Sequence, residues 1–239
     1  MGKPSIRCYI LTIIRAPDVI TLIGAGIAAA SMIVAISGSI ELSIRLLFLS
    51  YFFDILDGVV ARRLGISDDK GLMLDRAVDR ISQVIVPLAV YTSWANTKGL
   101  SYLYSLSIIV YASIIVTVAL YRLVYRVVST LEYFHGLPMF FHAGLLLTAV
   151  LSDRLINPLI LIMGAIMSAL PIRYYRRHSE STPSPAPWLR MALVLLISII
   201  PYKHKFIYII SSVIFYILII YMVIGPIMYL ILYEKRIRT

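Results

Sequence analysis

Long apolar runs separated by short polar segments extend along the whole chain. A helix that crosses a bilayer needs about 20 apolar residues, because its backbone N–H and C=O groups must pair with one another in lipid. The pattern predicts eight such helices, of which the fifth and seventh are shorter than a full span; six or seven is the alternative count. The predicted spans are residues 17–37, 42–61, 72–95, 102–121, 138–151, 156–172, 188–201 and 206–232. We therefore expect an all-α integral membrane protein, a bundle of about eight transmembrane helices.

The segment before the first predicted span, residues 3–15, mixes Arg7 and Arg15 with several aliphatic residues and a tyrosine. Such a mixture is typical of a helix that lies in the membrane interface. The Ser- and Pro-rich segment from His178 to Pro187 is predicted to be an exposed loop rather than a linker between domains. We expect a single membrane domain over residues 1–239 with an N-terminal interfacial helix.

The composition excludes a water-soluble globular protein. Hydrophobic residues make up 60% of the chain and charged residues 14%, whereas ordinary soluble domains have about 25% charged residues. The mean hydropathy is +0.90. Cys8 is the only cysteine, so an internal disulfide is excluded as well.

The distribution of cations predicts the orientation in the membrane, because Lys and Arg are retained on the cytoplasmic side. With eight spans, fourteen loop or flanking cations share the side of the N-terminus, and four lie on the opposite side: Lys98, Arg154, Lys203 and Lys205. Both termini are therefore expected in the cytoplasm, with the protein in the cell membrane. The net charge of +10 is explained by this topology and by attraction to anionic lipids, and no nucleic-acid partner is expected.

Four aspartates lie inside or at the edge of the second and third predicted spans, where ionisable groups are costly. Asp54 and Asp57 are three positions apart and Asp75 and Asp79 are four apart, so each pair shares one helix face. A short loop joins the two spans, which allows the four carboxylates to converge. Hard divalent cations would hold such carboxylates ionised, which predicts Mg2+ or Mn2+.

Small residues and one arginine accompany the aspartates. Gly58, Ala61 and Gly71 leave room for a ligand beside the carboxylates, and Arg62 supplies donors suited to a phosphate. The combination indicates a site for a pyrophosphate. Intramembrane carboxylates are also compatible with a cation or proton transporter, but a transport relay does not require the Gly/Ala/Arg residues.

The run Asp54-x-x-Asp57-Gly58-x-x-Ala61-Arg62, followed after eight residues by Gly71-x-x-x-Asp75-x-x-x-Asp79, resembles the signature of the CDP-alcohol phosphatidyltransferases. The resemblance implies an enzyme that transfers a phosphatidyl-type group from a CDP-linked lipid to an alcohol and releases CMP. It implies two divalent metal ions held by the four aspartates, with Asp79 also acting as the base. The CDP-lipid site so implied comprises Asp54, Gly58, Ala61, Arg62, Gly71 and, beside Asp18 in the first span, Thr21.

Further segments are similar to phosphatidylserine synthases, in the same order along the chain. They are Ile81-Ser82 with Pro87, Phe134–Pro138 with Ala143-Gly144, Met167-Ser168 with Ile172–Tyr174, and Gly225-Pro226. This similarity implies L-serine as the acceptor, with Ser82, Arg122 and Arg126 as acceptor-site residues, and a homodimer, which is common in this family. The donor is CDP-diacylglycerol or, if a hot-living archaeon is the source, CDP-archaeol.

The acceptor has two alternatives with the same chemistry, inositol phosphate and glycerol phosphate. Leu74-Asp75 followed by Asp79-Arg80 is similar to the members that use inositol phosphate. Gln83 and Val84 depart from the serine-synthase pattern, which has Phe and Gly there. Arg126 stands one place later than the pattern requires.

Overall fold

The computed structural model describes residues 15–65, 69–124, 133–175, 187–200 and 204–237. The predicted interfacial helix at residues 3–15 falls almost entirely outside these ranges, as does Arg126. The helices are α2 (Ala16–Ile36), α3 (Ile40–Leu64), α4 (Asp69–Arg80), the π-helix η1 (Ile81–Ile85), α5 (Val86–Asn96), α6 (Tyr102–Val124), α7 (Met139–Leu151), α8 (Pro158–Ala169), α9 (Pro187–Ile199) and α10 (Lys205–Ile237).

The described residues form eight helical rods, because α4, η1 and α5 follow one another without a break. Each rod overlaps one of the eight predicted spans, so the helical architecture is confirmed. Two details were not predicted. The third rod contains a π-helical segment, and two three-residue strands, β1 (Tyr133–His135) and β2 (Arg173–Tyr175), pair antiparallel, so the fold is not purely α.

Within the described part of the chain, three helices are long and apolar enough to cross a membrane: Ala16–Ile36, Tyr102–Val124 and Lys205–Ile231. Three shorter apolar helices accompany them: Met139–Leu151, Pro158–Ala169 and Leu189–Ile199. α3 and the α4–α5 rod carry the charged residues of the site. These helices support an integral membrane protein.

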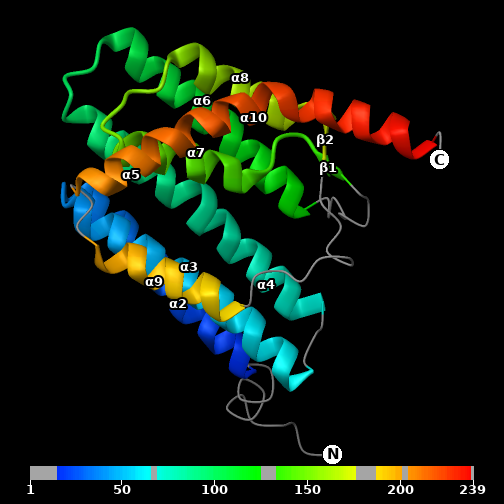
Figure 1. Cartoon of the computed structure of the whole chain (residues 1–239). Coiled ribbons are helices and arrows are strands. Elements are labelled where there is room, and N and C mark those ends of the chain that lie inside the picture. The colour runs from blue at the N-terminus through cyan, green and yellow to red at the C-terminus, as the bar shows by residue number, and fades with distance from the viewer. Residues whose placement is uncertain (1–14, 66–68, 125–132, 176–186, 201–203, 238–239) are drawn as a thin grey trace, which may run out of the picture.

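The helices form two groups with the α4–α5 rod between them (Figure 1). α9 packs on α3, which packs on α2, while α10 packs on α7 and α8 packs on α6. α7 is buried on nearly all sides, which explains why a helix of only 13 residues is apolar around its whole circumference.

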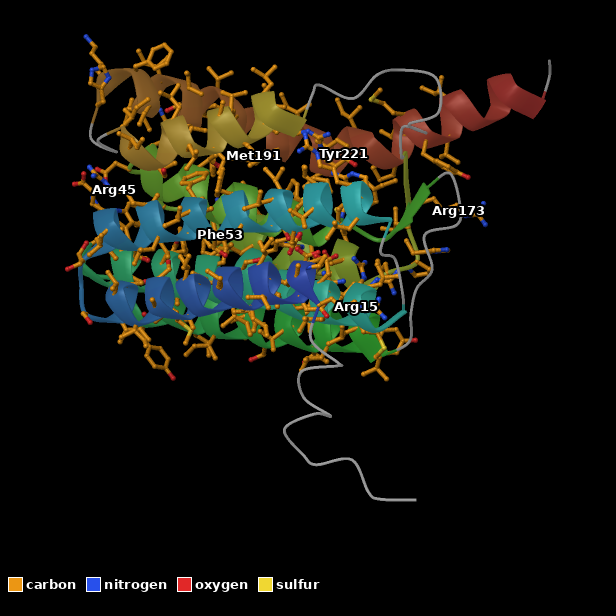
Figure 2. All side chains as sticks on the ribbon, turned by 90° about the horizontal axis from the view of Figure 1, so that it is seen from below. Arg15, Arg45, Phe53, Arg173, Met191 and Tyr221 are labelled. Atoms are coloured by element: carbon orange, nitrogen blue, oxygen red, sulfur yellow. The ribbon has the colours of Figure 1, made fainter. Side chains whose placement is uncertain are left out.

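The bundle has two ends, which we call the strand end and the far end. The strand end contains the β1–β2 pair, the α3–α4 junction and the start of α2, and the far end contains the α2–α3 turn (Figure 1). Arg15 and Arg173 lie at the strand end and Arg45 at the far end, with Phe53 between them (Figure 2).

Small residues allow α2 and α3 to pack closely. Ser31 Oγ donates to the Ser43 carbonyl at 2.7 Å, and Ser43 Oγ donates to the Ser31 carbonyl at 2.8 Å. Two turns earlier on α2, Ser50 Oγ donates to the Gly24 carbonyl at 2.9 Å. Such small-residue contacts are typical of helix pairs in membranes. They set the register that brings Thr21 of α2 beside α3.

Candidate metal centre

The antiparallel arrangement of α3 and α4 brings three of the four aspartates together. Asp54, Asp57 and Asp75 each offer one carboxylate oxygen, and these oxygens all lie within 4.8 Å of one another. Asp57 is 6% exposed, whereas Asp54 and Asp75 are partly exposed. The cluster thus has one buried ligand and an open side.

The donor set fits a hard divalent cation. All three side chains supply oxygen atoms, the ligand type that Mg2+ and Mn2+ prefer. Three carboxylates held this close and partly out of water would repel one another without a cation. The cluster can therefore hold a metal ion, as the sequence predicted.

Asp79 lies one turn after Asp75 on α4 and outside this group of three. It remains close enough to Asp54, Asp57 and Asp75 for their charges to interact. Gln83 Nε2 donates to Asp79 Oδ1 at 2.5 Å. One carboxylate oxygen of Asp79 is thus held by Gln83, which leaves Oδ2 for other partners.

Thr21, which was predicted to belong to the CDP-lipid site, lies beside Asp57. Its Oγ1 donates to Asp57 Oδ2 at 2.6 Å, and both side chains are buried. Thr21 therefore orients a candidate metal ligand. The neighbouring Asp18 caps α2, since its Oδ2 accepts a hydrogen bond from the Arg15 backbone N–H at 3.0 Å.

Of the residues predicted to line the CDP-lipid, Gly58, Ala61 and Arg62 lie on the last two turns of α3 and Gly71 on the first turn of α4, while Asp54 lies one turn earlier on α3 and Thr21 on α2. The Arg62 guanidinium folds back over Gly58: a Cβ on Gly58 would lie 3.3 Å from Arg62 Nη1. This position leaves Arg62 exposed and close enough for its charge to act on Asp57. Ala61 and Gly71 are partly exposed on the same two helices. A phosphate near the cluster would find donors at Arg62.

The π-helical segment begins two residues after Asp79. Ser82 within it is 3% exposed, and its Oγ lies 3.4 Å from the Asp79 carbonyl. Tyr51 of α3 donates from its hydroxyl to the Ser82 carbonyl at 3.0 Å. π-Helical turns widen the backbone and often occur at functional sites. Here the segment ties the helix that carries Asp75 and Asp79 to α3.

Arg122 binds three backbone carbonyls. Its Nη1 donates to the Leu137 carbonyl at 3.0 Å, and its Nη2 donates to the carbonyls of His135 at 2.7 Å and Ser168 at 2.6 Å. These carbonyls belong to the segments before α7 and at the end of α8. Arg122 therefore joins two of the segments that resemble phosphatidylserine synthases, Phe134–Pro138 and Met167-Ser168.

Gly136 lies beside Arg122 in the corner formed by the segment before α7 and the end of α8. Its φ of +68° is a left-handed conformation, and a Cβ there would clash with Arg122 Nη2 and lie 2.6 Å from the Ser168 carbonyl. Its N–H donates to the Ile172 carbonyl at 2.6 Å, next to β2. The Phe134–Pro138 and Ile172–Tyr174 segments are thus adjacent in space, which their sequence separation did not reveal.

Two side chains of the site were not predicted to have a role there. Gln83 is four residues after Asp79 and is the only glutamine in the chain. These two features could have singled it out from the sequence as a partner of Asp79. Tyr51 lies one turn before Asp54, but tyrosines are too abundant in this sequence for that position to stand out.

The comparisons with known proteins agree with this geometry. The model of one family, described as CDP-alcohol phosphatidyltransferase, matches residues 14–172, which is more than half of the chain. This range contains all eight positions of the aspartate motif. A search of the curated proteins found no match. With the motif, the carboxylate cluster and this match in agreement, the chain belongs to the CDP-alcohol phosphatidyltransferase family.

Proposed function

We propose that the protein transfers the phosphatidyl or archaetidyl group of a CDP-lipid to the hydroxyl of L-serine and releases CMP. The observation that carries the proposal is the cluster of Asp54, Asp57 and Asp75 oxygens within 4.8 Å, in a chain that belongs to the CDP-alcohol phosphatidyltransferase family. We propose that the whole chain, residues 1–239, serves this one function.

The cluster provides the metal site of the proposed reaction. Asp54, Asp57, Asp75 and Asp79 would hold one or two divalent ions, and a bound cation would neutralise the pyrophosphate and polarise the phosphorus. Thr21 keeps Asp57 in the orientation that ligation needs. Arg62, together with Gly58, Ala61 and Gly71, is proposed to bind the diphosphate of the donor.

Asp79 is proposed as the base. The serine oxygen forms a bond to the lipid-linked phosphorus, the bond from that phosphorus to the CMP oxygen breaks, and CMP leaves with the bonding electrons. The hydroxyl proton passes to Asp79. Because Gln83 occupies Oδ1, Oδ2 is the oxygen that would receive it.

The acceptor is proposed from the serine-synthase-like segments. Arg122, Gly136 and Ser168 bring these segments into one corner at the strand end, and Ser82 lies one turn from Asp79. We propose that Ser82, Arg122 and Arg126 belong to the acceptor side of the site. Inositol phosphate is the second candidate, supported by Arg80, which directly follows Asp79.

The orientation and assembly are part of the same proposal. The strand end, which has more of the cations, would face the cytoplasm, with both termini on that side and the site open to soluble acceptors. A homodimer is proposed because members of this family are commonly dimers.

The test is CMP release by the purified protein from CDP-diacylglycerol or CDP-archaeol with Mg2+ or Mn2+. Serine, inositol phosphate, glycerol phosphate and no acceptor are offered in parallel, with Asp57→Asn as the inactive control. CMP release only with serine is the expected result. Release only with another acceptor would refute serine, and no release by folded, metal-loaded protein would refute the proposed transfer.

A further inference from the structure

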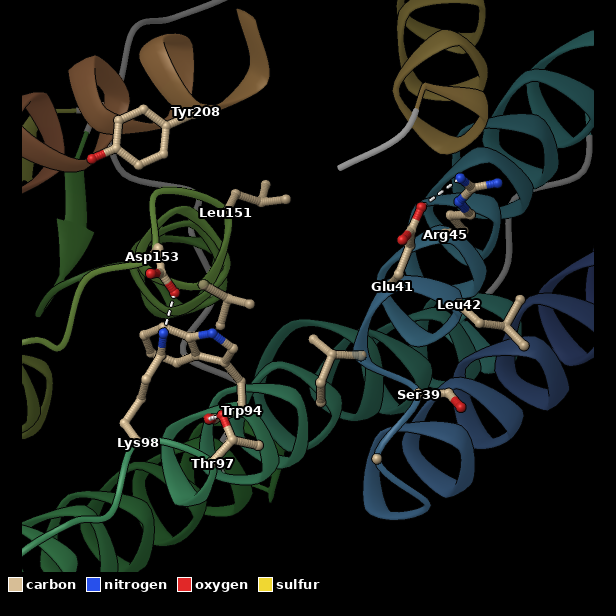
Figure 3. A pocket seen from close by; sticks show the side chains of 13 residues that line it. Ser39, Glu41, Leu42, Arg45, Trp94, Thr97, Lys98, Leu151, Asp153 and Tyr208 are labelled. Atoms are coloured by element: carbon tan, nitrogen blue, oxygen red, sulfur yellow. Dashed lines mark hydrogen bonds and ion pairs between the residues drawn. The ribbon is translucent and has the colours of Figure 1, made fainter. Parts of the chain in front are cut away.

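A second site is present at the far end of the bundle. An open cavity of about 1040 Å³ lies between the α2–α3 turn and the start of α3 on one side, and the ends of α5 and α7 with the start of α10 on the other. Its size is at the upper end of the range for ligand pockets. Its lining includes Glu41, Arg45, Trp94, Lys98, Asp153 and Tyr208 (Figure 3).

This cavity is separate from the aspartate cluster. Glu41 precedes Asp54 by 13 positions on the same helix, which at about 1.5 Å per residue places the two roughly 20 Å apart. Lys98 follows Asp79 across the whole α5 rod. The cavity therefore lies at the other end of the bundle from the metal centre.

Each wall carries one ion pair. Arg45 Nη2 lies 2.7 Å from Glu41 Oε1 on α3, and Lys98 Nζ lies 2.5 Å from Asp153 Oδ1 on the other wall. The pairs face each other across the opening (Figure 3). The four charged side chains balance to zero, so the cavity offers both a cationic and an anionic partner to a ligand.

The lining also includes two aromatic rings, those of Trp94 and Tyr208, and the Lys98 ammonium lies 5.2 Å from the centre of the Trp94 ring. Tryptophan and tyrosine rings are enriched at the headgroup level of membranes.

We propose that this cavity binds the headgroup of a zwitterionic phospholipid. Arg45 and Lys98 are the cationic partners proposed for its phosphate. Glu41, Asp153 and the Tyr208 ring are the partners proposed for its ammonium group. Anionic headgroups and nucleotides lack the ammonium and would meet two carboxylates. The apolar lining, Ile40, Leu42, Val150 and Leu151, suits the upper part of the acyl or ether chains.

The first test measures lipid binding to the purified, detergent-solubilised protein by native mass spectrometry. The probes are dioleoylphosphatidylethanolamine, dioleoylphosphatidylglycerol and water-soluble glycerophosphoethanolamine. The double variant Arg45→Gln/Lys98→Gln is compared with Lys205→Gln, which removes an exposed cation at the same end but outside the cavity. The double variant should bind phosphatidylethanolamine at least tenfold more weakly, whereas Lys205→Gln should bind it like the wild type.

Three results would overturn the proposal. The first is equal phosphatidylethanolamine affinity in the wild type and the double variant. The second is tighter binding of phosphatidylglycerol with the same loss on substitution, which would make the cavity an anion site. The third is binding of glycerophosphoethanolamine as tight as that of the lipid, which would make the ligand soluble.

A second measurement tests the proposal without the double variant, in case that variant misfolds. Trp188→Phe leaves Trp94 as the only tryptophan, because the chain has two. A phosphatidylcholine that carries a nitroxide on its ammonium group should then quench Trp94 fluorescence saturably at low lipid ratios. Unlabelled phosphatidylethanolamine should reverse the quenching. Non-saturable quenching that unlabelled lipid does not reverse would contradict the proposal in a protein with native lining residues.

Discussion

The 2.6 Å hydrogen bond from Thr21 to Asp57 links α2 to the candidate metal centre. Thr21→Val keeps the shape of the side chain and removes the donor. Because partners that orient metal ligands affect metal binding strongly, we expect about 10- to 100-fold weaker Mn2+ affinity. Titration of the purified protein with Mn2+ measures this, and Thr21→Ser, which keeps a hydroxyl, should restore most of the affinity. Equal affinity in wild type and Thr21→Val would show that Thr21 does not orient a ligand.

Asp79 is the residue on which the proposed proton transfer depends. Asp79→Asn retains the volume and the contact with Gln83 but cannot accept the hydroxyl proton. We expect kcat for CMP release to fall about 10²- to 10⁴-fold, with an unchanged thermal unfolding midpoint. Near wild-type turnover in this variant would assign the base to another group.

Gln83 acts on Asp79 rather than on a substrate. Gln83→Met removes the hydrogen bond to Asp79 Oδ1 and leaves that carboxylate freer to rotate. We expect kcat to fall about tenfold with the serine KM little changed, because only the proton acceptor is displaced. The pH profile of kcat should shift as well. If the substitution changed only the free energy of unfolding, Gln83 would be a packing residue with no role in positioning Asp79.

At the scale of elements, the turn between β1 and α7 depends on one glycine. Gly136→Ala would place a methyl group against Arg122 and the Ser168 carbonyl in a left-handed conformation, so we expect about 3 kcal/mol of destabilisation. Gly99 is the matched control: its φ is +68° but a Cβ there meets nothing within 4 Å. Gly99→Ala should therefore cost only about 1 kcal/mol of backbone strain. Chemical or thermal unfolding in detergent compares the two, and equal losses would contradict the role of Arg122 as the partner in the clash.

The helices themselves were predictable, because each apolar run is long enough to bury its backbone in lipid. The α2–α3 turn, where Gly38 has a φ of +89°, and the end of α3 at Gly65 match the predicted boundaries within a few residues. The π-helical turn after Arg80 could not be read from the sequence, since a shift of hydrogen bonds by one residue leaves the apolar pattern almost unchanged. The β1–β2 pair was not predicted because its strands are only three residues long and 38 positions apart at their closest, from His135 to Arg173.

At the scale of the whole molecule, orientation is the main open prediction. In a Cys8→Ser background, Arg63→Cys reports the strand end and Ser37→Cys the far end, since both positions are exposed. A membrane-impermeant thiol reagent added to intact cells should label Ser37→Cys alone. After permeabilisation both should react, which confirms that each cysteine is accessible. Labelling of only Arg63→Cys in intact cells would invert the proposed topology.

The sequence by itself determined the membrane class, the eight helical segments and the identity of the aspartates, because hydrophobic length and i, i+3 or i, i+4 spacing are local properties. Only the tertiary structure decided which groups complete the site. Thr21 reaches Asp57 across 36 positions, and Arg122 reaches the Ser168 carbonyl across 46. It also decided that Asp54, Asp57 and Asp75 form the closest set, and that the charges of α3 share one cavity at the far end with Lys98 and Asp153, which follow the ends of α5 and α7. These contacts depend on how helices far apart in the sequence pack together, and no local sequence pattern specifies which of them will be neighbours.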